Sequence, residues 1–248
     1  MPDIQEEVEE LDPSLELYYK DRISKLEKKL KESYRESNLA QQLRVRCFKL
    51  ANETPSPPDW LIETDNKSPN SPGTPTLMLS DWHWSEVVRP EEVNFKNAFN
   101  INIARSRARF CIEGALEVLF KHQVVPEYQG LVLALGGDMI SGSIHDELKE
   151  SNEMEIMPTV IDLVEVLTWA INKLREKFEN IFIPCVTGNH GRYTQKIRMK
   201  QRAFQSYDWL IYTMLEKTFL NNKKIQFFIP EGPDALYQVH GVKYILTH

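Results

Sequence analysis

Four short apolar segments of this sequence are each followed by side chains that can bind a metal ion. The segments are residues 77–79, 131–135, 181–186 and 242–246, and the groups that follow are Asp81 and His83, Asp138, Asn189 and His190, and His248. Apolar runs of this length are typical of strands buried in a sheet. Because the carboxyl ends of the strands in an open α/β sheet meet at one crevice, where ligands bind, we expect these side chains to lie close together.

Asp81 and His83 are separated by one residue. The two-residue repeat of an extended chain would direct both side chains to the same side. A carboxylate and an imidazole that point into one cleft suit a divalent cation. The triplet alone would also fit a solvated aspartate beside a histidine that caps a strand. The recurrence of similar strand ends at Asp138 and His190 favours the metal site.

This ordered set resembles the motifs of the calcineurin-like metallophosphoesterases of phage and bacterial type. The matching residues are Asp81-x-His83, Gly137-Asp138, Gly188-Asn189-His190 and the later strand-end His248. The resemblance extends over about residues 76–248. It implies an α/β fold with a layered β-sandwich flanked by helices. It also implies phosphoester hydrolysis with two divalent metal ions, for which manganese is expected first and zinc, iron or magnesium are alternatives.

The resemblance assigns a role to each matching residue. Asp81, His83 and Asp138 would bind the first metal. Asp138 would bridge to the second metal, which Asn189 and His248 would also bind. His190 would bind no metal and would act as a general acid, or stabilise charge, at the leaving oxygen, since an imidazole titrates near neutral pH.

Three features depart from the family pattern. Gly191 stands where an acidic residue usually follows the motif histidine. The family also has a Gly-His-x-His motif near its C-terminus, which supplies one ligand to each metal, and this sequence does not contain it. The strands that normally complete the sandwich would have to follow His248. We therefore expect a metallophosphoesterase domain that is truncated at its C-terminus, and an orienting group for His190 that comes from elsewhere or is missing.

The densest basic segment follows His190 and consists of Arg192, Lys196, Arg198, Lys200 and Arg202. A phosphate-rich substrate would be attracted to it, although a solvated helix start would have the same composition. Arg192 and His145 are the candidate substrate-binding residues. Trp82 and Trp84 could stack on a base or aryl group, or could simply pack in the core.

Three functions remain open at this point. The basic segment, and a resemblance to recombination-type nucleases within the superfamily, favour hydrolysis of a phosphodiester in nucleic acid or a nucleotide. An enzyme that acts on phosphomonoesters, including phosphoproteins, is the first alternative. A non-catalytic scaffold that binds a partner through its N-terminal helix is the second.

The N-terminal part of the sequence differs from the rest. Residues 14–50 carry apolar side chains at three- and four-residue spacing among many charges, which predicts a helix. This helix could pack on its own domain, self-associate as a short coiled coil or bind a partner. Residues 53–75 are rich in proline and predict a linker, within which residues 60–62 could anchor the chain to a surface or be the remainder of a small N-terminal module. We expect a helical appendage over 1–52, the linker over 53–75 and the enzyme domain over 76–248.

Helical spacing recurs over residues 95–121, 158–178 and 204–220. On the first of these helices, Phe99, Ile103 and Phe110 are expected on the inner face. Residues 235–247 resemble two strands joined at His240 and Gly241 as a hairpin. Strands that alternate with helices indicate an α/β architecture.

Composition narrows the class of protein. A net charge of −6 argues against a dedicated nucleic-acid binder, which is usually basic. The three cysteines are widely spaced and form no CxxC pair, so a disulfide framework is not expected. Residues 1–10 lack the apolar core of a signal peptide, and no apolar run has the length of a membrane span. We expect a cytoplasmic protein without membrane association.

Overall fold

The structure is a computed structural model that describes residues 13–52, 55–62, 73–123, 128–144, 151–194 and 201–248. The contacts divide the chain into two units, Met1–Glu53 and Thr54–His248. The first unit contains the helix α1 (Pro13–Asn52), which confirms the helix predicted over residues 14–50. The second unit begins at Thr54, whereas the linker prediction places the start of the folded domain near residue 76.

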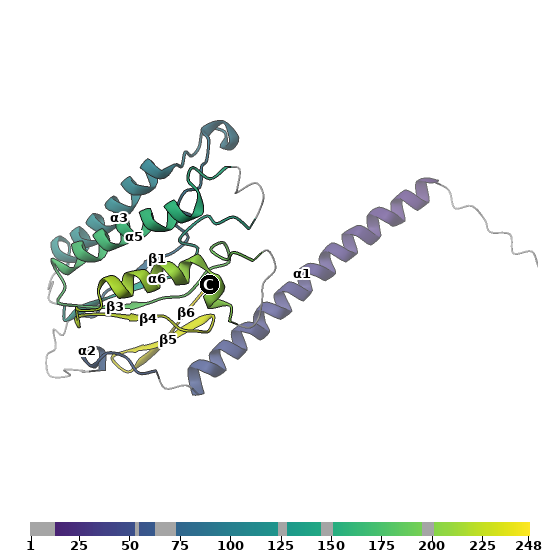
Figure 1. The fold of residues 1–248 in the computed structure, drawn as a ribbon. Helices are drawn as coiled ribbons and strands as arrows, with labels where there is room; N and C mark the ends of the chain where they lie inside the picture. Colours follow the sequence, from purple (N-terminus) through teal and green to yellow (C-terminus); the bar gives the residue numbers. More distant parts are fainter. Residues whose placement is uncertain (1–12, 53–54, 63–72, 124–127, 145–150, 195–200) are drawn as a thin grey trace, which may run out of the picture. The chain divides into compact units, whose positions relative to one another are not determined.

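The centre of the second unit is a parallel sheet with the strand order β1-β2-β3-β4 (Figure 1). Its strands are β1 (Thr76–Leu79), β2 (Gly130–Leu135), β3 (Asn180–Pro184) and β4 (Ile225–Phe228). The first three were predicted from their apolar runs. β4 was not predicted, because it is only four residues long and Gln226 interrupts its apolar character.

The predicted strand over 242–246 exists but belongs to a different sheet. β5 (Asp234–Val239) and β6 (Val242–Thr247) pair in antiparallel fashion, which confirms the predicted hairpin. The turn between them places His240 and Gly241 at positive φ, 46° and 82°. The expectation that all four apolar runs end at the edge of one sheet is therefore wrong for the last of them.

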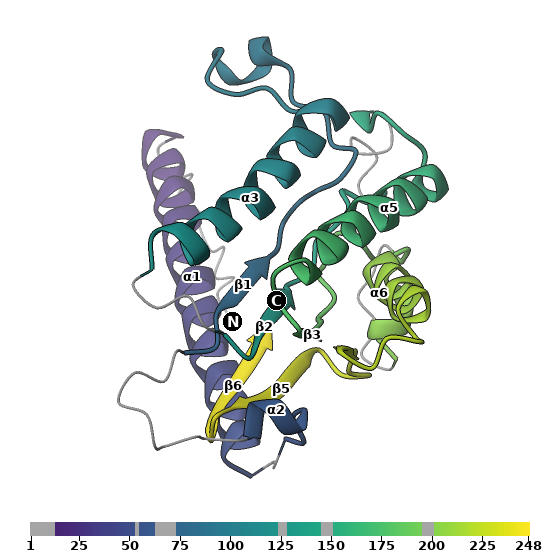
Figure 2. The ribbon, with the colours of Figure 1, turned by 90° about the vertical axis from the view of Figure 1, so that its left-hand side faces the viewer.

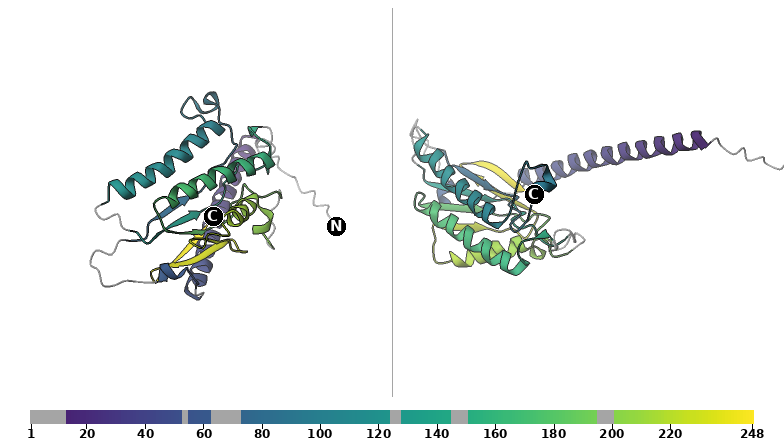
Figure 3. Two further views of the ribbon diagram at one scale, coloured as in Figure 1. Left: turned by 60° about the vertical axis from the view of Figure 1, so that its left-hand side comes forward. Right: turned by 90° about the horizontal axis from the view of Figure 1, so that it is seen from above.

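The parallel sheet is covered on both faces, which makes a mixed α/β structure (Figures 2 and 3). One face packs against α3 (Ile101–Lys121), α5 (Ile156–Arg175) and α6 (Tyr207–Thr218). The other face packs against the β5–β6 hairpin and the short helix α2 (Asp59–Ile62). Successive side chains of β2 alternate between these two cores, with Leu131, Leu133 and Leu135 on the helix side and Val132 and Ala134 on the hairpin side. A strand buried on both faces is apolar throughout, which explains why β2 was predictable.

Two side chains cap the N-termini of the helices α3 and α6. Asn100 accepts a hydrogen bond from Ile103 N and caps α3, and Ser206 accepts one from Asp208 N and caps α6. The remaining short elements are the 3₁₀ helices η1 (Pro90–Val93) and η2 (Ala203–Gln205). Within the described residues, no helix is both long enough and apolar enough to cross a bilayer.

The inner face of α3 differs from the prediction. Its buried residues are Ile101, Ala104, Ala108 and Ile112, whereas Phe110 is 81% exposed. Phe110 is two residues from both Ala108 and Ile112, and at 3.6 residues per turn it therefore lies on the opposite side. Alanine is only weakly hydrophobic, so the spacing of the alanines does not identify the buried face of α3 from the sequence.

Residues 60–62 are part of the folded unit. Leu61 is completely buried, and its carbonyl oxygen accepts a hydrogen bond of 2.7 Å from His240 N in the hairpin turn. Trp60 packs on the hairpin side of the sheet beside Gly130. The triplet thus anchors the chain to a surface, one of the two roles considered for it. Residues 63–72 of the predicted linker lie outside the described residues.

Candidate metal centre

The loops that follow β1 and β2 remain paired beyond the ends of the strands. Asp81 N donates to Gly137 O at 3.0 Å, and His83 N donates to Asp138 O at 3.1 Å. Asp81, His83 and Asp138 all have positive φ, at 55°, 44° and 48°. This conformation is uncommon for residues with a side chain, and such residues cluster at functional sites. Three of the eight non-glycine residues with positive φ in the described part of the chain are thus residues selected from the sequence.

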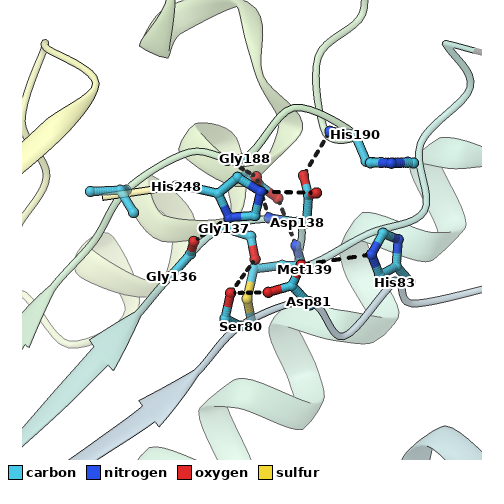
Figure 4. A network of polar contacts seen from close by, with 12 residues as sticks. Ser80, Asp81, His83, Gly136, Gly137, Asp138, Met139, Gly188, His190 and His248 are labelled. Carbon is cyan, nitrogen blue, oxygen red and sulfur yellow. Dashed lines mark hydrogen bonds and ion pairs between the residues drawn. The ribbon is translucent and has the colours of Figure 1, made fainter. Parts of the chain in front are cut away.

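Asp81, Asp138 and His248 each offer one ligand atom, and these atoms lie within 4.8 Å of one another (Figure 4). They come from the loop after β1, the loop after β2 and the residue after β6. Asp138 is buried and His248 is partly buried: 4% of the Asp138 side chain and 15% of the His248 side chain are exposed, compared with 60% for Asp81. The structure thus brings together one predicted ligand of the first metal, the predicted bridging carboxylate and one predicted ligand of the second metal.

Both carboxylate oxygens of Asp138 have protein partners. Oδ1 accepts a hydrogen bond of 2.6 Å from His190 N, and Oδ2 lies 3.1 Å from His248 Nε2. Burial alone would raise the pKa of Asp138, but the contacts with His248 and His190 outweigh it and lower the pKa below its ordinary value. Asp138 is therefore ionised at neutral pH. A Cβ on Gly188 would overlap this carboxylate, so the glycine makes room for it.

His248 is oriented by a backbone carbonyl. Its Nδ1 lies 2.8 Å from Gly136 O, an atom that can only accept, so Nδ1 carries the proton of the neutral ring. With the ring protonated, Nε2–H donates to Asp138 Oδ2. Loss of that proton would leave a lone pair on Nε2, which is the arrangement of a metal-binding histidine held by a carbonyl on its other nitrogen. The hydrogen bond to Asp138 raises the pKa of His248 to about 9 despite burial.

The donor chemistry of this group fits a divalent cation. Two carboxylates and one imidazole nitrogen suit manganese, zinc or iron, and the carboxylates also suit magnesium. The proton shared between His248 and Asp138 marks a position where positive charge is stabilised. A bound cation would take the place of that proton, because a histidine ligand must be deprotonated.

His83 lies beside this group rather than in it. Its Nε2 is 4.0 Å from Asp81 Oδ1, and its Nδ1 is 3.9 Å from Glu86 Oε2. Its ring meets the ring of His190 edge to face, with centroids 4.7 Å apart. The predicted first metal site of Asp81, His83 and Asp138 is therefore assembled only in part.

His190 lies close to Asp138 through its backbone, and its ring Nδ1 is 3.3 Å from Ser141 O. The carbonyl oxygen can only accept, so Nδ1 is the donor and the lone pair of the neutral ring lies on Nε2. Asn189 lines a small cavity with Arg192 and Arg202. The cavity has a volume of about 10 Å³, room for about one water molecule, and is too small for a phosphate.

The substrate-binding predictions meet the structure only at Arg192. Its Nε is buried and finds no hydrogen-bond partner within the described part of the chain. His145 and three members of the basic segment, Lys196, Arg198 and Lys200, lie outside the described residues. The role of Arg192 in substrate binding stays a prediction.

Asp208 is a site residue that was not recognised from the sequence. It lies in the first turn of α6, is completely buried, and accepts hydrogen bonds from the backbone N–H groups of Asp138, Met139 and Gly188 at 3.2, 3.2 and 2.9 Å. Burial raises its pKa to about 6. Asp208 thus ties the loop after β2 to the loop after β3.

The Asp208 carboxylate also explains why residue 191 is a glycine. A Cβ at this position would meet all three atoms of the Asp208 carboxylate at 2.9 Å. An acidic residue after the motif histidine would collide there, so in this chain Asp208 places a carboxylate behind the turn from another element. The signal in the sequence was the pair Ser206 and Asp208 at a helix start, which is common in proteins and carries no functional information by itself.

Neither a scan against protein-family models nor a search of curated proteins finds a match for this chain.

Proposed function

We propose that this chain is a metal-dependent hydrolase of phosphoesters. The observation that supports the proposal most directly is the group Asp81, Asp138 and His248, whose ligand atoms lie within 4.8 Å of one another. His83 and His190 extend this group on one side, in mutual ring contact. Phosphoester hydrolysis can use a metal ion as a Lewis acid and an imidazole as a proton donor, and this group of residues offers both a set of metal ligands and neighbouring imidazoles.

The residues take different parts in this reaction. Asp138 and His248 would hold a divalent cation from the less exposed side, and Asp81 would complete the group from the solvent side. A bound divalent cation supplies Lewis acidity at a phosphoryl oxygen and lowers the pKa of water. His190 delivers a proton to the leaving oxygen from Nε2, because Nδ1 is directed to Ser141 O.

The proposed substrate is a phosphodiester of a nucleotide or nucleic acid, and the alternative is a phosphomonoester. We would compare bis(4-nitrophenyl) phosphate with 4-nitrophenyl phosphate, using the full chain with and without Mn²⁺. Faster metal-dependent turnover of the diester is expected. Faster turnover of the monoester would replace the substrate assignment, and no metal-dependent turnover of either would overturn the proposal.

Asp138→Asn tests whether turnover belongs to the candidate centre. The variant keeps the size of the side chain but removes the negative charge, so metal-dependent turnover should be lost. Glu113→Gln is the matched control, since Glu113 is an exposed carboxylate on α3. Equal activity of the two variants would place the reaction elsewhere in the chain.

His190→Ala tests the general acid. The variant should keep its metal but lose about 10²–10⁴-fold in rate on an alkyl phosphoester. The loss should be smaller on a nitrophenyl ester, because that leaving group departs without a proton. If the variant loses metal, or slows both esters equally, His190 is a ligand or a stabiliser of phosphoryl charge instead.

A metal-binding scaffold that self-associates or binds a partner through α1 is the second candidate. It is favoured by an exposed apolar stripe on that helix, in which Tyr19, Ile23, Leu26 and Leu30 are 51–58% exposed. Sedimentation of the wild type and of Leu26→Lys/Leu30→Lys measures self-association. A dimer that the substitutions dissociate, together with metal binding but no hydrolysis, would favour the scaffold.

A further inference from the structure

A cavity of about 240 Å³ opens directly beside the candidate metal centre. It is lined by Asp81, Trp82, Trp84, Phe99, Ala104, Arg107, Ala108 and Cys111. Asp81 therefore belongs both to the metal-ligand group and to the wall of this cavity. A ligand in the cavity would extend from the metal centre toward α3.

Trp82 and Trp84, which form the aromatic wall of the cavity, are positioned by contacts with neighbouring side chains. Trp84 is buried, and its Nε1 donates to Asp162 Oδ2 at 2.7 Å. The ring of Trp82 stacks on that of Trp84, with centroids 5.9 Å apart and 30° between the planes. Trp82 is half-buried and so presents a supported indole to the cavity.

Arg107 is fixed at the rim. Its guanidinium lies over the ring of Phe99, 5.4 Å from the centroid. Its Nη2 donates to Asn97 Oδ1 at 3.0 Å and to Ala98 O at 3.3 Å. A guanidinium fixed in this way offers a flat cationic surface for stacking at little further cost in conformational entropy.

The floor of the cavity is made by small side chains of α3. Ala104 and Ala108 are one turn apart, and Cys111 continues the same side of the helix. The volume of about 240 Å³ is below the roughly 300–1,000 Å³ of sites that enclose drug-sized ligands. It suits a single planar ring system.

We propose that this cavity binds the nucleobase of a nucleotide phosphoester whose phosphate lies at the metal centre. The assignment of the phosphate rests on the proposed function. A base would stack on Trp82 and Arg107, and its path to the phosphate would pass Asp81. Stacking on aromatic and guanidinium surfaces accepts any base, so the cavity selects for a planar ring rather than for one sequence.

The first test measures binding without any catalytic step. Cys111 lines the cavity, Cys47 is an exposed thiol on α1, and Cys185 is buried. We would alkylate the full chain with iodoacetamide and follow each thiol by peptide mass spectrometry. Adenosine should slow the modification of Cys111 severalfold and leave Cys47 unchanged. Equal rates at Cys111 with and without adenosine at millimolar concentration would overturn the proposal.

The second test separates the base from the phosphate. The 4-nitrophenyl ester of thymidine 5′-phosphate and methyl 4-nitrophenyl phosphate share a leaving group, but only the first carries a base. Its KM should be about tenfold lower. Ala108→Leu fills the cavity and should abolish this difference, and Arg107→Gln should reduce it without altering the floor. Ser106→Leu, on the exposed side of α3, is the control and should retain it.

The outcomes distinguish the two proposals. Hydrolysis of both esters with equal KM, without protection of Cys111, would overturn the base site and leave the hydrolase standing. Protection of Cys111 without hydrolysis of either ester would support the base site and overturn the hydrolase. Thermal unfolding of each variant shows whether a change in KM reflects the cavity or a loss of fold.

Discussion

The candidate metal centre has a buried half and an exposed half that are built differently. In the buried half, Asp138 and His248 contact each other and also hydrogen-bond to His190 N and Gly136 O. In the exposed half, Asp81 and His83 are 4.0 Å apart, and 60% of Asp81 is exposed. The protein itself therefore orients the first pair, whereas positive φ and a neighbouring serine position the second. If this group holds a cation, Asp138 and His248 would contribute more to its affinity than Asp81.

The largest effect is expected from Asp208, whose carboxylate supports the loop that carries Asp138. Asp208→Ala would leave three buried N–H groups without an acceptor, those of Asp138, Met139 and Gly188. Each such group costs about 1–3 kcal/mol, so we expect a loss of about 3 kcal/mol or more in the free energy of unfolding. Urea denaturation followed by circular dichroism measures it. Glu216→Ala, an exposed acid on the same helix, is the control, and equal stability of the two variants would show that Asp208 does not support the loops.

The metal affinities of two variants test which half contributes more to cation binding. Asp138→Asn should weaken Mn²⁺ binding by more than about 100-fold, because even partners that only orient a ligand contribute about 10–100-fold. Asp81→Asn should weaken it less, by about tenfold, since a solvated carboxylate contributes less than a buried one. Calorimetric titration of both variants decides the point. A larger loss in Asp81→Asn would reverse the comparison.

The pH dependence of stability reports on His248 in the metal-free protein. Its pKa is raised from 6.5 to about 9, so its protonated form stabilises the fold. This contribution is fully present below about pH 6.5 and is lost as the pH rises through about 9. Unfolding in urea with EDTA should therefore show stability that falls over this range, and His248→Gln should flatten the decline. The control is His122→Gln, which should keep the pH dependence of the wild type. If His248→Gln keeps it as well, the contact between His248 and Asp138 contributes nothing to the pH dependence of stability.

The smallest effect is expected in the exposed half. Ser80 Oγ donates to the carboxylate of Asp81, and Ser80→Ala removes this contact. We expect Mn²⁺ affinity to fall by about tenfold or less, at the lower end of the range for groups that orient a ligand. The free energy of unfolding should be unchanged. A loss as large as that in Asp138→Asn would mean that the exposed half also depends on organisation by the protein.

Local patterns were sufficient for much of the fold. The apolar runs of β1, β2 and β3, the helical spacing of α1, α3, α5 and α6, and the hairpin of β5 and β6 could all be predicted. β4 is too short and too mixed in polarity to give a period. Phe110 was placed on the wrong face because a large aromatic residue outweighed the small alanines that actually pack.

The sequence alone determined which residues offer the chemistry, because a strand end followed by Asp or His is a local feature of the chain. Asp81, Asp138, His190 and His248 were all selected in this way. Only the tertiary structure decided how they combine, since hydrogen bonds join residues as far apart as Asp138 and His248. The same holds for Asp208, whose carboxylate acquires its importance from N–H groups 20 to 70 residues away along the chain. Folding also created the cavity beside Asp81, because the space between the stacked tryptophans and the alanines of α3 exists only when the helix packs on the sheet.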